Sequence, residues 1–576
     1  MYKAKKSLLS VAIVAVTFGL AACGGSSNDS TPTATLPVNS APTDITLSAS
    51  NASENEAGAT IGMLSVSDVD TSDTFTFVVS DDRFEINGTT LKLKAESTLD
   101  FEQEANVSLT ITVTDSANAT FNKDMIIAVN DLLDYYDYES KSLTGISSVS
   151  YTGQIARQLL INDLSKLIGA ELSDASTFDT NGTFVNRDEV INALNSYFDV
   201  ADYDVVSQRP LLTLTTPSSL QSMLVDLSSS SKNLVGKVAG NDATGQHKDW
   251  NNGEFVGWGT KGSTTPEQLI RILFGMLADN AQTQLDGAVR QDPFGNDITN
   301  ISLTSDGLDL KQLIQKFLLM SVAFSQGVDD YLDNDVAGKG LLSDHTDTTK
   351  AYTSLEHQFD EAFGYFGAAR NYLDYSDEEV AAKGGRDDYQ LYHDTNGDGS
   401  IDFNSEYNFS QSTNASKRDR GATVANDFSK TAMTAFLQGR KLLNDTAGVD
   451  LTEAQRTELY GYRDTVVDTW EKAIAATVVH YINDLRSDLE KIGTDDFSYA
   501  NTAKHWSEMK GFGLGLQFNK TSLLSDEDFA MVHSIMGDMP VLIGEAEVTA
   551  YRVSLLTARD LLQAAYAFDA DNVANW

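Results

Sequence analysis

The stretch LTEAQRTELYGYRDTVVDTWEKAIAATVVHYINDLRSDLEKIG, residues 451–493, decides the fold of most of the chain. Its apolar side chains recur at steps of three or four, the period of an amphipathic helix. They are Leu459, Tyr462, Val466, Trp470, Ile474, Val478, Tyr481, Leu485, Leu489 and Ile492. Thr452 with Gln455 forms a capping-box start, and Gly493 is a stop signal. A helix of about 40 residues spans roughly 60 Å, a length typical of helical bundles.

Five further stretches between residue 151 and the C-terminus have the same helical period. They are residues 265–285, 308–332, 348–373, 422–443 and 541–568. Glycine, asparagine and aspartate are concentrated between them. The sequence therefore predicts a large all-α helical-bundle domain over residues 132–576.

Residues 41–131 have a period of two instead, which indicates strands. Apolar and polar side chains alternate in 45–47, 75–79, 91–94 and 109–114, and Ser/Asp/Asn/Gly-rich breaks separate these runs. This spacing is typical of a β-sandwich. We therefore expect a multidomain chain, with a small all-β sandwich followed by the all-α domain.

The composition restricts the partners of the chain. Its 83 acidic side chains outnumber its 41 basic ones, which gives a formal net charge of −42. A surface with this excess of acid excludes nucleic acid as a partner and favours divalent cations. The single cysteine excludes a disulfide framework and any cysteine cluster for zinc or iron–sulfur.

The N-terminus has the pattern of an export signal. Lysines precede a short apolar run, and Leu20-Ala21-Ala22-Cys23 resembles the lipobox of bacterial lipoproteins. The resemblance implies a signal peptide over residues 1–22, acylation of Cys23 and a membrane partner through that lipid anchor. Residues 23–40 then form a flexible Gly/Ser/Thr tether. Because Gly24 follows the cysteine, we expect an outer-membrane lipoprotein of the cell envelope, on its periplasmic face or at the cell surface. The alternative is a plain secretory signal with an incidental cysteine.

The β-domain carries acidic motifs in its loops. Ser53-Glu54-Asn55-Glu56, Asp68-Val69-Asp70, Leu99-Asp100-Phe101-Glu102 and Val129-Asn130-Asp131 together resemble one cadherin-like repeat over about 90 residues. The resemblance implies calcium ligands, and hard carboxylate oxygens suit that ion. The candidates are Glu54, Asp68, Asp70, Asp100, Glu102 and Asp131. A tandem neighbour that would complete each cluster is missing, and solvated acidic loops on a spacer domain are the alternative.

A second calcium candidate lies between predicted helices. Residues 394–406 resemble an EF-hand loop, with oxygen-bearing side chains at alternate positions and glycine at the sixth. The candidate ligands are Asp394, Asn396, Asp398, Ser400, Asp402 and Glu406. Ser405 stands where the twelfth-position glutamate belongs, and Glu406 comes one residue late. An Asx/Gly turn without metal is the alternative.

Histidine and acid share a helical face at two further places. His357 precedes Asp360 and Glu361, and His505 precedes Glu508, at spacings of three or four. His480 with Asp484 forms a weaker pair of the same kind. Such pairs are interior ion pairs that fix helix register, or ligands for iron, zinc or copper.

The His-x-x-acid pattern is similar to the Gly-x-His-x-x-Glu motif of the imelysin-like superfamily of bacterial envelope proteins. Leu355 and Ala503 replace its glycine in the two patches. The resemblance implies a helical bundle that takes up iron, with His357, Asp360, Glu361, His505 and Glu508 as transition-metal ligands.

These patterns lead to two functional hypotheses. The first is a calcium-binding envelope lipoprotein whose helical domain handles a transition metal such as iron. The second is a calcium-dependent cell-surface adhesion or interaction protein with an envelope or cell-surface protein as its partner. Zinc-peptidase, serine-hydrolase and phosphate-loop motifs are missing from the sequence, so we predict that the chain is not an enzyme and disfavour peptidase activity.

Overall fold

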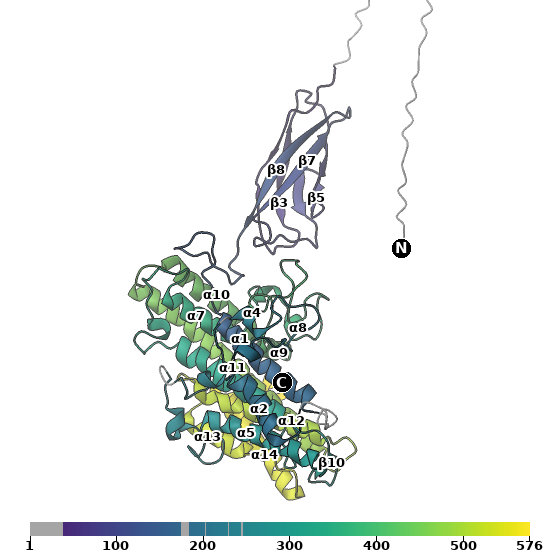
Figure 1. The fold of residues 1–576 in the computed structure, drawn as a ribbon. Helices are drawn as coiled ribbons and strands as arrows, with labels where there is room; N and C mark the ends of the chain where they lie inside the picture. Colours follow the sequence, from purple (N-terminus) through teal and green to yellow (C-terminus); the bar gives the residue numbers. More distant parts are fainter. Residues whose placement is uncertain (1–37, 174–183, 202, 229, 243–245) are drawn as a thin grey trace, which may run out of the picture. The chain divides into compact units, whose positions relative to one another are not determined.

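The computed structural model describes residues 38–173, 184–201, 203–228, 230–242 and 246–576 (Figure 1). It confirms the expected fold class, with strands before residue 131 and helices after residue 150. The chain divides into two compact units that meet in sequence between Asp131 and Leu132. The predicted signal peptide, Cys23 and most of the tether lie outside the described residues.

The first unit is a sandwich of two four-stranded sheets with strand orders β1-β3-β6-β5 and β2-β8-β7-β4. Its strands are β1 Asp44–Leu47, β2 Asn51–Ser53, β3 Thr60–Ser67, β4 Thr76–Val79, β5 Phe84–Asn87, β6 Thr90–Leu93, β7 Asn106–Thr114 and β8 Thr120–Asn130. Pairing is antiparallel except between β2 and β8, which run parallel. The alternation in β7 buries Val107, Leu109, Ile111 and Val113 in the core between the sheets.

The second unit is built from helices of very different length (Figure 1). The α-helices are α1 Thr152–Lys166, α2 Arg187–Phe198, α3 Tyr203–Val206, α4 Leu224–Leu227, α5 Pro266–Leu285, α6 Leu310–Leu318, α7 Ser354–Phe366, α8 Asp377–Val380, α9 Ser410–Arg420, α10 Phe428–Thr446, α11 Glu453–Glu490, α12 Tyr499–Gly513, α13 Asp526–Met536, α14 Glu545–Tyr566 and α15 Ala570–Asn575. A short hairpin of β9, Arg290–Gln291, and β10, Asp297–Ile298, lies between α5 and α6.

Helix α11 organises this unit, as the opening stretch predicts. It has 38 residues, and Thr452 and Gln455 form the expected reciprocal cap. It packs against α9, α10, α12, α14 and α15. Around Ala475 and Thr477 the helix is buried on every side, because neighbours cover its polar face as well as its apolar stripe.

Two predicted helices differ from the observed ones. The stretch 308–332 begins as α6 and continues in the wider π-helical segments η5, Leu319–Phe324, and η6, Gly327–Tyr331. The only α-helix in the stretch 348–373 is α7, because Thr353 caps its start with Glu356 and Gly367 ends it in a left-handed conformation.

None of the helices in the described ranges is long and apolar enough to cross a membrane.

Candidate metal centre

Strand pairing brings the first two acidic residues of the site together. Strands β2 and β8 run parallel with Ser53 opposite Asn130. Glu54 and Asp131 are the next residues of these two strands, so the register places them side by side. The backbone N–H of Glu54 donates to the carbonyl oxygen of Asn130 over 3.3 Å. The pairing of β2, the shortest strand of the sandwich, thus fixes the relative position of two carboxylates that are far apart in sequence.

The loop between β6 and β7 adds the third acid, Glu102. Its backbone is held against the Glu54 segment by two hydrogen bonds. The N–H of Phe101 donates to Oε2 of Glu54 over 2.7 Å, and the N–H of Asn55 donates to the carbonyl of Leu99 over 3.0 Å. The carboxylate of Glu54 therefore fixes the loop that carries Glu102.

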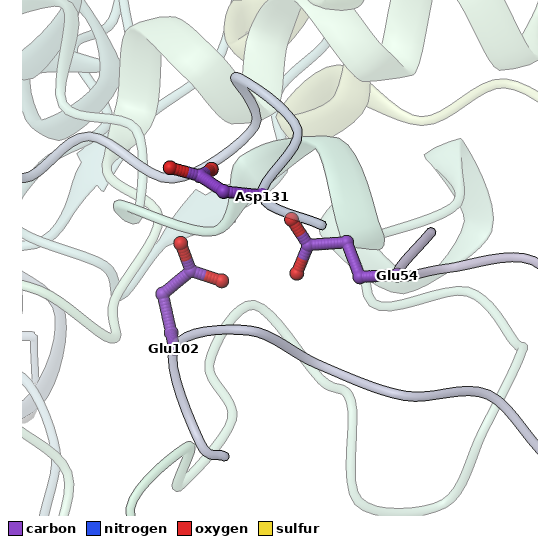
Figure 2. Close-up of side chains that lie close together, drawn as sticks. All are labelled: Glu54, Glu102 and Asp131. Carbon is purple, nitrogen blue, oxygen red and sulfur yellow. The ribbon is translucent and has the colours of Figure 1, made fainter. Parts of the chain in front are cut away.

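The carboxylates of Glu54, Glu102 and Asp131 gather in one place (Figure 2). One oxygen of each lies within 4.8 Å of an oxygen of the other two. Glu54 is only 1% exposed, whereas Glu102 and Asp131 are open to solvent. Like charges this close repel one another, and a divalent cation removes that repulsion. Oxygen-only donors with open sides suit calcium, which takes six to eight oxygens in flexible geometry.

A second acidic group lies near the other end of the sandwich, where β3 leads into β4. It consists of Asp68, Asp70 and Asp73, again with ligand oxygens within 4.8 Å of one another. The backbone N–H of Ser40 donates to Oδ2 of Asp70 over 2.7 Å. One oxygen of Asp68 and one of Asp73 are buried without a hydrogen-bond partner, so this group also has the charge and the open coordination of a cation site.

The structure adds one residue to the expected cadherin-like ligands and separates another from them. Asp73 was not among the candidates, although Asp68-Val-Asp70-Thr-Ser-Asp73 shows acids at close spacing. Asp100 is outside both groups, and its two oxygens accept from the backbone and side chain of Gln103. Its side chain caps the local turn instead of joining Glu102.

In the EF-hand-like loop, residues 394–406, backbone N–H groups of the loop donate hydrogen bonds to the loop's own carboxylates. Asp394 accepts hydrogen bonds from three backbone N–H groups of the turn that follows it. Glu406 is 1% exposed and accepts from the backbone N–H groups of Thr395 and Asp402. The loop also contains Asn396, Asp398 and Ser400. In the described part of the chain, its acids do not form a group of three close enough for one ion.

The candidate ligands on α7 belong to an ion-pair network inside the helical unit. Arg440 of α10, 0% exposed, donates from Nε to Asp360 and from Nη1 to Glu356, both over 2.7 Å. Tyr136 donates to the same oxygen of Asp360 over 3.0 Å. Burial opposes the charge on Arg440, but the two carboxylates outweigh it and raise the pKa of the guanidinium. Asp360 therefore already forms an ion pair with a buried cation of the chain, Arg440.

His357 does not share this network. Its Nδ1 atom lies 2.9 Å from the carbonyl oxygen of Ser150, and its ring stacks on Tyr352. Its Nε2 atom lies 3.8 Å from Glu361, which accepts a hydrogen bond from Gln154. The expected set of His357, Asp360 and Glu361 is thus divided between separate partners.

His505 and Glu508 on α12 also have separate partners. Nδ1 of His505 lies 2.7 Å from Asp488 of α11, and its Nε2 atom lies 3.7 Å from Asp484. Asp484 also contacts His480 over 3.4 Å, so two histidines share one carboxylate. Glu508 instead lies 3.4 Å from Lys316 of α6.

The structure therefore does not assemble the expected transition-metal set. The acidic groups that could hold an ion within the described ranges are the two in the β-unit, and neither contains a histidine. The carboxylates on α7 and α12 contact cations or hydrogen-bond donors of the chain, and the histidines contact its carbonyl and carboxylate oxygens. A buried charge left without a partner is costly.

The fold and these sites define a protein with an acidic β-sandwich and a large helical domain. Over residues 135–535 the chain matches the family described as "Domain of unknown function (DUF4856)", and it belongs to that family. Among curated proteins, none matches the chain. Among solved structures, the chain is similar to the crystal structure of human protocadherin-24 EC1-2, with 21% sequence identity and a TM-score of 0.15. That similarity covers 20% of this chain and 58% of the solved one.

Proposed function

We propose that this protein is a calcium-binding protein of the cell envelope, in which calcium orders the β-unit for contact with another molecule at the cell surface. The observation that carries the proposal is the group formed by Glu54, Glu102 and Asp131. Register and loop hydrogen bonds hold these acids together. Calcium neutralises their repulsion and joins the ends of β2 and β8 to the Glu102 loop.

The second acidic group supports the same proposal. Asp68, Asp70 and Asp73 are near Ser40 and Ser116, away from the first group. One calcium ion at each of the two groups would hold the loops at both ends of the sandwich in position. The cadherin-like motifs of the sequence fall on five of these six acids, and that resemblance favours calcium. Magnesium suits such open groups less well, because it requires a stricter octahedral geometry.

Calcium binding by the purified protein tests the proposal directly. After EGTA treatment, equilibrium dialysis with radioactive calcium gives the number of sites and their affinity. We expect Glu54→Gln to lose one site, because it removes the buried charge of the first group. Glu56→Gln is the matched control, since Glu56 is an exposed acid of the same loop outside the group. Equal calcium binding by wild type and Glu54→Gln would contradict the proposal.

The lipid anchor at Cys23 and the outer-membrane location belong to the same proposal and rest on the sequence alone. Mass spectrometry of the protein from cells tests the anchor, because acylation adds a hydrocarbon mass to the peptide that begins at Cys23, and separation of inner from outer membranes tests the location.

Transition-metal handling stays a prediction from the imelysin-like resemblance, and the lack of catalytic activity stays a prediction from the missing enzyme motifs. The separate partners of His357 and His505 favour the calcium-dependent interaction protein over the iron-handling one. Elemental analysis of protein purified without chelator separates the two. Iron near one equivalent, lost in a His357→Ala/His505→Ala double variant, would support the iron-handling function instead.

A further inference from the structure

The helical unit contains an open cavity of about 460 Å³ whose charge is opposite to that of the protein. The whole chain has twice as many acidic as basic side chains. The cavity lining, in contrast, includes five lysines and a single carboxylate, that of Glu508. The lysines are Lys166, Lys311, Lys316, Lys417 and Lys504. They come from α1, α6, α9 and α12, so only the tertiary fold gathers them.

Most of these lysines have no carboxylate partner. Lys316 lies 3.4 Å from Glu508, and Lys166 donates to two backbone carbonyls. Within the ranges that the structure describes, Lys311, Lys417 and Lys504 form no ion pair. In so acidic a protein, unpaired lysines around one cavity leave a local positive potential.

The lysines also repel one another, and burial together with this repulsion lowers the pKa values of two of them. Burial lowers the pKa of Lys316. The loss of solvent around Lys417, followed by repulsion from Lys316, lowers the pKa of Lys417 to about 8, although its side chain still reaches solvent. A bound anion would remove this mutual repulsion.

Two further features of the wall point to a ligand. Helix α9 begins in this wall at Ser410, and Phe409 before it provides no side-chain cap. A helix N-terminus without a cap attracts anions. In addition, Nδ2 of Asn408 and Oε2 of Glu508 are buried without a hydrogen-bond partner. Asn408 offers a donor, and Glu508 offers an acceptor for a hydroxyl group.

We propose that this lysine cavity binds a small multivalent anion that carries phosphate or carboxylate groups together with a hydroxyl group. The volume falls within the range of small-molecule sites, about 300–1,000 Å³. Ammonium groups that approach from several helices suit a ligand with more than one anionic group, because each acts as a separate point charge. The site is distinct from the acidic groups of the β-unit and does not depend on calcium.

Titration calorimetry of the purified protein with inorganic pyrophosphate and with citrate tests the proposal, in buffer with EGTA. We expect at least one of the two anions to bind, with an affinity that falls as the salt concentration rises. Binding of pyrophosphate alone assigns a phosphate ligand, and binding of citrate alone assigns a hydroxycarboxylate.

The critical variant is Lys311→Gln/Lys504→Gln, which removes two cavity charges that form no ion pair and should leave the fold intact. Its affinity should fall at least about tenfold. The control is Lys141→Gln/Lys430→Gln, which removes the same charge from exposed lysines outside the cavity and should change affinity less than about twofold. Circular dichroism confirms that both variants are folded. Two results would overturn the proposal: no binding of either anion at millimolar concentration, or equal weakening by the two double variants.

Discussion

The charge network around Arg440 in the core of the helical unit contains both signs, whereas the group around Glu54 in the β-unit gathers close charges of one sign. Arg440 meets Glu356 and Asp360 in complete burial, so that network is neutralised by the chain itself. The group around Glu54 contains acids alone among its candidate ligands. The comparison shows that close charges support the fold in one unit, whereas in the other unit they concentrate negative charge that attracts a cation. A compensated network supports the fold, whereas a group of close acids favours a bound cation that removes its repulsion.

The largest effect should come from breaking the compensated network. Arg440→Met leaves two buried carboxylates without their cation and should destabilise the helical unit by about 3–5 kcal/mol. Urea unfolding followed by tryptophan fluorescence measures this loss. All five tryptophans lie in the helical unit, so the signal reports on that unit alone.

Two variants control this experiment. Arg420→Met breaks an exposed pair with Glu378 and should cost less than about 1 kcal/mol. Arg440→Met combined with Glu356→Gln and Asp360→Asn removes all three charges and should recover part of the lost stability. If Arg440→Met unfolds at the wild-type urea concentration, the network contributes nothing to stability.

The next effect tests the acidic group around Glu54. Calcium at about one hundred times its dissociation constant should stabilise the β-unit by about 2.7 kcal/mol and raise its melting temperature by on the order of 10 °C. Calorimetry detects both units, whereas tryptophan fluorescence detects only the helical one. We expect calcium to shift the calorimetric transition of the β-unit and to leave the fluorescence transition nearly unchanged. A shift of the fluorescence transition alone would instead indicate calcium at residues 394–406.

A smaller effect tests whether close helix packing holds the compensated network in place. Gly439 precedes Arg440, and a Cβ atom there would lie 2.5 Å from Cζ of Phe359 on α7. Gly439→Ala should therefore push α10 from α7 and cost about 1–3 kcal/mol in urea unfolding. Gly461 on α11 has open space around it, so Gly461→Ala should stabilise the helix by about 0.5–1 kcal/mol. The same sign for both variants would be evidence against tight packing at Gly439.

The smallest effect concerns pH. Burial, followed by repulsion from Arg418, lowers the pKa of His480 to about 4, against the attraction of Asp484. Trp576 and His505 also face this ring. Because the unfolded histidine binds a proton below about pH 6.5 and the folded one does not until about pH 4, stability falls as the pH drops through that range. His480→Gln should remove on the order of 1–2 kcal/mol of this loss. Unfolding midpoints at pH 7.5 and 4.5 measure it, and equal pH dependence in both proteins would contradict the assignment.

The candidate site could be predicted only in part. Glu54, Glu102 and Asp131 were found from acidic motifs, because loop carboxylates beside strands are visible in the sequence. The sequence did not show that Asp100 turns toward Gln103, because a single residue separates Asp100 from Glu102 and only the loop conformation distinguishes them. The lysine cavity has no sequence motif at all, since its charges come from four separate helices.

By itself, the sequence determined the type and position of the main secondary structure. The period of residues 451–493 gave helix α11, the capping pair Thr452 and Gln455 gave its start, and alternation gave the strand β7. These signals are local, because hydrogen bonding and side-chain spacing within one element produce them. Only the tertiary structure decided which charges meet. Asp360 shares a helix with His357, yet it pairs with Arg440, which is eighty residues away in sequence. The reason is physical: a buried guanidinium needs counter-charges from whichever helices pack around it, and that packing is not a local property.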